Sequence, residues 1–195
     1  MKNFITFCCI FFTAFFMQSQ NLTIDELALL RKKSFGNLEE TLSSKNWVYI
    51  EGQEAEEGSM ESATFAFNKK EYDDSAQAFL KFIYDNSENE ELCSHRIVLH
   101  FFTKEKYNRY INRLKAIGCE LIKSQIEDGV INKIYQGKTT TFKLSIVAEK
   151  DDFGTTKTRY QLFVISNADY FIFFVVVSSL RELLEKQIEE DNKKN

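Results

Sequence analysis

The chain has 195 residues, a formal net charge of −4 at pH 7 and a hydrophobic share of 44%. A mildly acidic balance of this kind lacks the basic surface that binds nucleic acid or an anionic membrane. The length allows one sizeable core or two small ones.

Residues 1–20 have the three-part build of a secretory signal peptide. Lys2 gives the positive start, and an apolar run of about 14 residues extends from Phe4 to Met17. A membrane-spanning helix needs roughly 20 residues, so a retained anchor is the less favoured alternative. We expect cleavage near Ser19 or Gln20 and export to the periplasm or the medium.

Cleavage would leave an acidic chain of charge −5 with two cysteines, Cys93 and Cys119. Thiols of exported proteins commonly pair, and closing this loop of about 26 residues would contribute roughly 3.5 kcal/mol. Two separately buried thiols are the alternative. Two sulfurs with no other Cys or His at ligand spacing do not make a zinc site, so we expect no metal and no cofactor.

Two short helices are predicted at the start of the processed chain. Thr23 and Glu26 have the spacing of a capping box, which predicts a helix that runs to about Lys33 and stops near Gly36. A second helix is expected over residues 38–45.

Strand periodicity then begins at Trp47, and a second helical segment divides the strands into two sets. Four strands are expected before that helix, around 47–49 and over 63–67, 76–84 and 96–102. The helix itself is expected between Thr103 and Gly118. Turn signals separate the four strands that follow, 119–123, 130–135, 141–148 and 159–165.

The two sets indicate a diverged internal repeat, with pseudo-repeats 21–102 and 103–166 in a single unit 21–195. Arg96 and Arg159 open similar runs in which Leu is fourth and Tyr is twelfth; chance likeness of two apolar strands is the alternative. Residues 170–177 are predicted to be buried, either as a strand or as a helix, and a terminal helix is expected over 179–190. The fold class is therefore α+β, with helices packed on antiparallel sheet.

No motif in the chain has the pattern of a catalytic or metal site. His95 and His100 are five residues apart on one strand, so they should point to opposite faces and share neither a metal nor a proton. The acidic stretch 51–61 lacks the Asp and Asn spacing of a calcium loop. Residues 136–141 lack the spacing of a phosphate-binding loop. Both segments are interpreted as hairpin connections.

Three longer segments carry a resemblance. They are LTIDELALLRKKS, RYINRLKAIGCELIKSQIEDGVINKIYQGKTTTFKLSI and YQLFVISNADY. In these segments the chain resembles short, uncharacterised exported proteins of Gram-negative bacteria, a likeness that implies no activity. The expected layout also resembles that of the tandem-repeat β-lactamase inhibitor protein, which grips an enzyme with a concave sheet. That second likeness is of layout only and assigns no residue a role.

These observations favour an exported, non-catalytic module that binds a protein or peptide partner on a partly open sheet face. The alternative is a small hydrolase with a carboxylate and histidine site, which requires His95 or His100 to lie in a pocket beside an acid or nucleophile. A structural component of the cell envelope is a third hypothesis. Neither a nucleic-acid partner nor a membrane span after cleavage is expected.

Overall fold

The computed structural model describes residues 22–55, 60–70, 75–85, 94–150 and 154–176, together with 183, 184 and 187. The predicted signal peptide 1–20, Cys93 and most of the predicted helix 179–190 lie outside the described residues.

The described chain is of the α+β class, as predicted, and its strands form one antiparallel sheet. The helical elements are α2 (Ile24–Leu30), α3 (Phe35–Ser43), α4 (Lys104–Ala116), α5 (Asn167–Tyr170) and the π-helix η1 (Phe171–Val176). The strands of the first half are β1 (Trp47–Gln53), β2 (Glu61–Phe67), β3 (Ala78–Tyr84) and β4 (Arg96–Phe101). Those of the second half are β5 (Glu120–Glu127), β6 (Val130–Gln136), β7 (Thr140–Lys150) and β8 (Thr156–Ser166).

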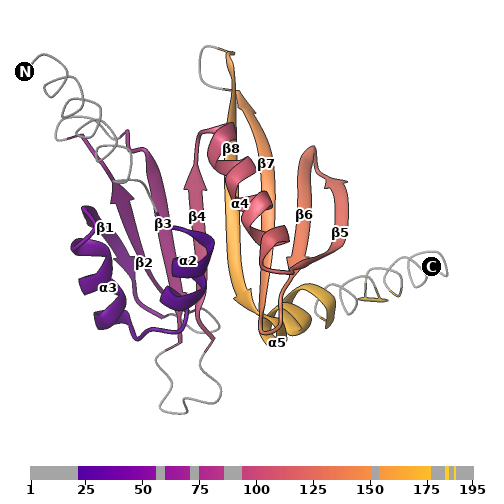
Figure 1. Cartoon of the computed structure of the whole chain (residues 1–195), viewed down its shortest axis with the longest axis horizontal. Coiled ribbons are helices and arrows are strands. Elements are labelled where there is room, and N and C mark those ends of the chain that lie inside the picture. The colour runs from indigo at the N-terminus through magenta and orange to yellow at the C-terminus, as the bar shows by residue number, and fades with distance from the viewer. Residues whose placement is uncertain are drawn as a thin grey trace, which may run out of the picture.

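The strand order is β1-β2-β3-β4-β8-β7-β6-β5, so each half contributes four consecutive neighbours and the halves meet at β4 and β8 (Figure 1). Helix α4 carries the chain from the centre of the sheet to its far edge. At the junction Leu99 pairs directly with Leu162, the two residues that the predicted repeat makes equivalent. A duplicated unit would give this arrangement, and the repeat itself stays a prediction.

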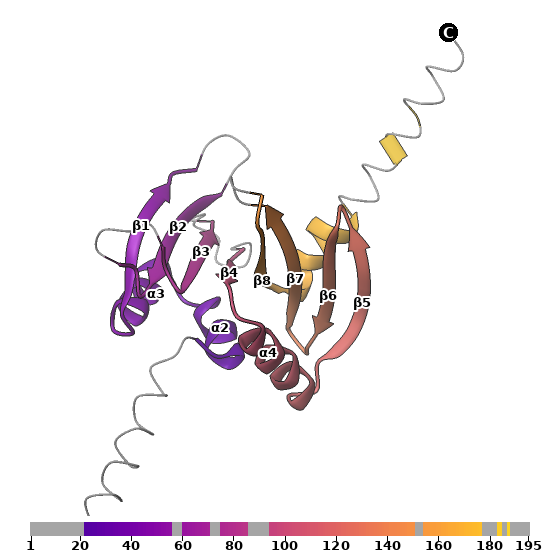
Figure 2. The ribbon, with the colours of Figure 1, turned by 90° about the horizontal axis from the view of Figure 1, so that it is seen from above.

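Helices α2, α3 and α4 lie on one face of the sheet, called here the first face, and α5 lies on the other, the second face (Figure 2). The main core fills the space between the first face and these three helices. Alternate residues of β2, β3, β4, β7 and β8 point into it, among them the fully buried Phe65, Phe82 and Leu99. Within the described ranges, no helix has the length and apolarity needed to cross a bilayer.

The capping box is confirmed, but the boundary between the first two helices is not where the sequence suggested. The Thr23 hydroxyl accepts a hydrogen bond from the backbone N–H of Glu26, whose carboxylate accepts one from the backbone N–H of Thr23. Helix α3 begins after Ser34, so Gly36 lies inside its first turn and does not end a helix. Gly36 does not have a positive φ there, which is the conformation that a helix-ending glycine takes.

The segment that follows β8 is helical, and its expected burial is confirmed for Tyr170 but wrong for residues 171–176. Apolar side chains of η1 are well exposed, from 58% for Phe171 to 37% for Val176. The segment still contacts the sheet, because the ring of Phe174 makes a T-shaped contact with that of Phe163 and stacks on Tyr170. Helix α5 begins at Ser166, whose hydroxyl accepts from the backbone N–H of Asp169. The capped turn starts a helix where β-branched and aromatic content favoured a strand.

Candidate functional site

The two histidines lie on opposite faces of the sheet, as their spacing predicts. The ring of His95 packs edge-on against Phe82 in the core, and its Nδ1 lies 3.1 Å from the carbonyl oxygen of Arg31. His100 pairs with Phe79 and Gln161 on the second face, and its Nδ1 is buried without a partner. Burial lowers the pKa of both rings. Neither histidine lines a described pocket.

Cys119 is half-buried at the end of α4, close to Gly137, and it forms no disulfide with a described residue. Its predicted partner, Cys93, lies outside the described residues, so the pairing stays a prediction. In the described part of the chain, no three His, Cys, Asp or Glu side chains gather in a way that could hold a metal ion.

A groove of about 370 Å³ crosses the first half of the second face. Strand register places Gln53, Ser62, Ile83 and Arg96 opposite one another on β1 to β4, so they form a row perpendicular to the strands. Lys81, two residues along β3, donates to the side-chain oxygen of Gln53 at 3.3 Å. The groove therefore has a mixed floor, polar at the sheet edge and apolar and basic toward the centre.

Arg96 and Phe173 form the central end of this groove. The Arg96 guanidinium lies over the Phe173 ring, 3.7 Å from its centroid, in a cation–π contact. Its Nε donates to the hydroxyl of Ser94, whereas one terminal nitrogen is buried with no hydrogen-bond partner in the described part of the chain. Burial lowers the pKa of Arg96, an effect that the carboxylate of Asp169 opposes. This end of the groove is thus aromatic and cationic, with an unused donor.

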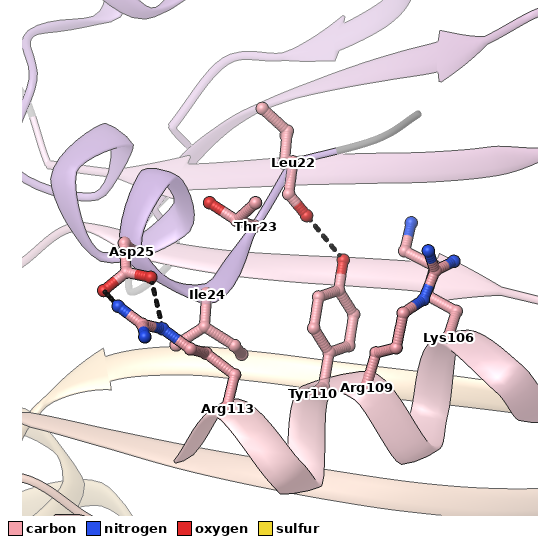
Figure 3. Close-up of a pocket in the computed structure, with 8 residues that line it drawn as sticks. All are labelled: Leu22, Thr23, Ile24, Asp25, Lys106, Arg109, Tyr110 and Arg113. Carbon is pink, nitrogen blue, oxygen red and sulfur yellow. Dashed lines mark hydrogen bonds and ion pairs between the residues drawn. The ribbon is translucent and has the colours of Figure 1, made fainter. Parts of the chain in front are cut away.

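A second pocket, of about 400 Å³, lies on the opposite side of the sheet, between the start of α2 and one flank of α4 (Figure 3). Helical spacing places Lys106, Arg109, Tyr110 and Arg113 along that flank. Leu22, Thr23, Ile24 and Asp25 form the opposite wall. The Tyr110 hydroxyl donates to the carbonyl of Leu22 at 2.8 Å and joins the two walls.

The two ends of this pocket differ in charge. At one end both Nε and a terminal nitrogen of Arg113 donate to the Asp25 carboxylate, at 2.8 and 3.0 Å, and this pairing lowers the pKa of Asp25. At the other end Lys106 and Arg109 lie beside each other (Figure 3). Only 5% of Lys106 is exposed, and its Nζ has no hydrogen-bond partner in the described structure. That end carries uncompensated positive charge.

Neither Arg96 nor Lys106 stands out as a site residue in the sequence. Arg96 marks the predicted repeat, and Lys106 belongs to an ordinary helix with a charged composition. The available signal was positional: Lys106 precedes the buried Tyr110 by four residues and therefore lies on the same flank. A lysine on the core-facing stripe of a helix is unusual, because its charge is costly to bury.

Comparison with other proteins assigns the chain to no family. The resemblance to short exported proteins and the likeness of layout to the β-lactamase inhibitor protein stay predictions. No protein-family model, curated protein or solved structure matches the chain significantly.

Proposed function

We propose that the protein is an exported, non-catalytic binding module that holds a protein or peptide partner in the groove on the second face of the sheet. The observation that carries this proposal is the buried, unpartnered nitrogen of Arg96 at the end of a groove walled by Phe173. Buried polar groups in native proteins nearly always have partners, so an unused donor in a groove favours an acceptor brought by a ligand.

The surroundings of the groove favour a macromolecular partner. The six apolar side chains of η1 are exposed directly beside it, and contiguous exposed apolar surface commonly marks an interaction site. Lys81 and Arg96 supply positive charge to the floor. A segment that carries an acidic side chain next to apolar ones complements this combination, since charge-assisted hydrogen bonds to arginine are strong and directional.

The hydrolase alternative has less support. It requires a histidine in a pocket beside an acid or nucleophile, whereas the described partner of His95 is a backbone carbonyl and Nδ1 of His100 has none. We therefore build no catalytic step on either residue.

Selection from a displayed library of random peptides tests the proposal. We expect the selected peptides to combine Asp or Glu with apolar residues. Replacing Phe173 by Ala should weaken their binding about tenfold or more, as the loss of an aromatic anchor does. Phe171→Ala is the matched control, because Phe171 is an exposed phenylalanine of the same helix that does not line the groove. Peptides that bind both variants equally well, or no selected peptide at all, would contradict the proposal.

A further inference from the structure

Lys106 is the most unusual charged residue of the described chain. Its side chain is buried between α4 and the sheet, and its Nζ lies 5.3 Å from the ring centroid of Phe101 and 5.5 Å from that of Tyr110. These rings attract a cation weakly through their faces but cannot accept a full hydrogen bond from each N–H. A buried ammonium normally has a carboxylate partner, and this one has none among the residues that the structure describes.

No lining group of the pocket can neutralise it. Asp25 is the only carboxylate among the described lining residues, and both of its oxygens are engaged by Arg113. Arg109 adds a second positive charge on the side of Lys106, and it has no carboxylate partner among the described residues. One end of the pocket therefore attracts a single anion, while the other end is already neutral.

The rest of the pocket is suited to an apolar body. Leu22, Ile24 and the ring of Tyr110 supply apolar walls, and the hydroxyl of Tyr110 is occupied by the carbonyl of Leu22. The volume of about 400 Å³ is within the range of small-molecule sites in proteins. A ligand with one anionic end and one apolar end would therefore complement this pocket.

We propose that the pocket between α2 and α4 binds a monocarboxylate with an apolar body, whose carboxylate pairs with Lys106 and Arg109 and whose body packs on Leu22, Ile24 and the Tyr110 ring. A free organic acid and the C-terminal carboxylate of a peptide share this chemistry. The site is independent of the groove that contains Arg96, because the two lie on opposite faces of the sheet.

Binding at this site is coupled to protonation of Lys106. Burial and the nearby charge of Arg109 lower the pKa of Lys106 to about 7. A carboxylate beside it favours the charged form, so binding above pH 7 takes up a proton and weakens by up to tenfold per pH unit. Below pH 7 the lysine is already charged and the affinity is flat. The other charged or titratable groups among the described lining residues are Arg109, Tyr110 and the ion-paired Arg113 on α4, and Asp25 on α2. From β4, Lys106 contacts the uncharged ring of Phe101.

Isothermal titration with octanoate tests the proposal, with 1-octanol as the uncharged probe. A peptide with a free C-terminal leucine and its amidated form make up the second arm. We expect octanoate, the free-carboxylate peptide or both to bind at pH 6.5, and neither 1-octanol nor the amidated peptide, which lack the carboxylate, to compete. Lys106→Met keeps the length of the side chain and should reduce binding at least tenfold. Lys115→Met, an exposed lysine of the same helix that lies outside the pocket, should leave it unchanged.

Comparing octanoate with the peptide distinguishes free acids from chain termini, and the Lys106 variant distinguishes this pocket from the groove. Binding of octanoate alone assigns the site to free acids, and binding of the peptide alone assigns it to chain termini. Lys106→Met should not change the affinity of peptides selected for the groove, so failure of one site leaves the other standing. If neither carboxylate binds, or if Lys106→Met binds as well as the unaltered protein, the proposal is wrong.

Discussion

The two faces of the sheet bury their residues by different means. Helices α2, α3 and α4 cover the first face over an almost wholly apolar core. The rings of Phe82 and Tyr84 stack there with their centroids 5.2 Å apart. The second face is only partly covered, by α5 and η1, and some of its buried positions are polar. Ser145, for example, donates to the side-chain oxygen of Asn132, and both residues are buried.

Because of this difference, the features that stabilise the fold and the features that suit a ligand lie in different parts of the molecule. Apolar burial on the first face needs no partner, whereas each buried polar group on the second face needs one. The unpartnered terminal nitrogen of Arg96 lies on the second face, and Lys106 lies at the margin of the first, where α4 meets the start of α2. Both proposed sites thus occur where the apolar cover ends.

The largest expected effect tests whether the first face supplies most of the stability. Phe82→Ala removes a fully buried ring and should lower the free energy of unfolding by about 4 kcal/mol. Phe79→Ala, on the same strand but half-buried on the second face, should cost about 1 kcal/mol. Urea unfolding measures both, and equal losses would remove the contrast between the faces.

Next in size is the effect of pH on stability through Lys106. Its pKa is about 7 in the folded protein and near 10.5 when unfolded, so between these values the unfolded chain binds more protons. The free energy of unfolding should therefore rise by about 2 kcal/mol from pH 7 to pH 9. Lys106→Met should be more stable than the unaltered protein at pH 7 and should lack this rise. The same slope in both proteins would show that Lys106 is not the group that titrates.

A smaller loss is expected from the polar pair on the second face. Ser145→Ala leaves the buried amide of Asn132 without its partner and should cost about 1.5 kcal/mol. Ser124→Ala on the exposed strand β5 serves as the control and should have no measurable effect. A loss no greater than that of the control would indicate that the second face does not depend on this hydrogen bond.

The smallest expected loss of stability comes from the caps of α2 and α3, two of the helices that cover the first face. Thr23→Ala removes the capping hydroxyl of α2 and should cost about 1 kcal/mol in thermal or urea unfolding. Ser34→Ala at the start of α3 should cost less, because the Ser34 side chain makes no capping hydrogen bond to the helix backbone. The reverse order would mean that α3 depends on its cap more than α2 does.

Much of the fold is readable from local patterns. Alternation of apolar and polar residues, an apolar run over 96–102 and the turn signals of the second half together located the eight strands of the described sheet. The turns were equally clear: Asp128 and Gly129, between β5 and β6, both have positive φ, which short polar residues and glycine tolerate. The errors lie where two signals compete, as at Gly36 and in the apolar segment 171–176.

The candidate sites were much less accessible to prediction. Lys106 and Asp25 belong to helices far apart in the sequence, and the groove row takes one residue from each of four strands. No local spacing encodes such neighbours. Their missing partners are visible only once burial is known.

The sequence by itself determined the type and order of the elements, the capped start of α2 and the α+β class, because these depend on residues within a few positions of one another. Only the tertiary structure decided that β4 lies beside β8 and that one face is sealed and the other partly open. It alone also decided that one nitrogen of Arg96 and the Nζ of Lys106 are buried without a hydrogen-bond partner among the described residues. Those outcomes depend on long-range packing, in which a residue's neighbours are set by the whole sheet and not by its own segment.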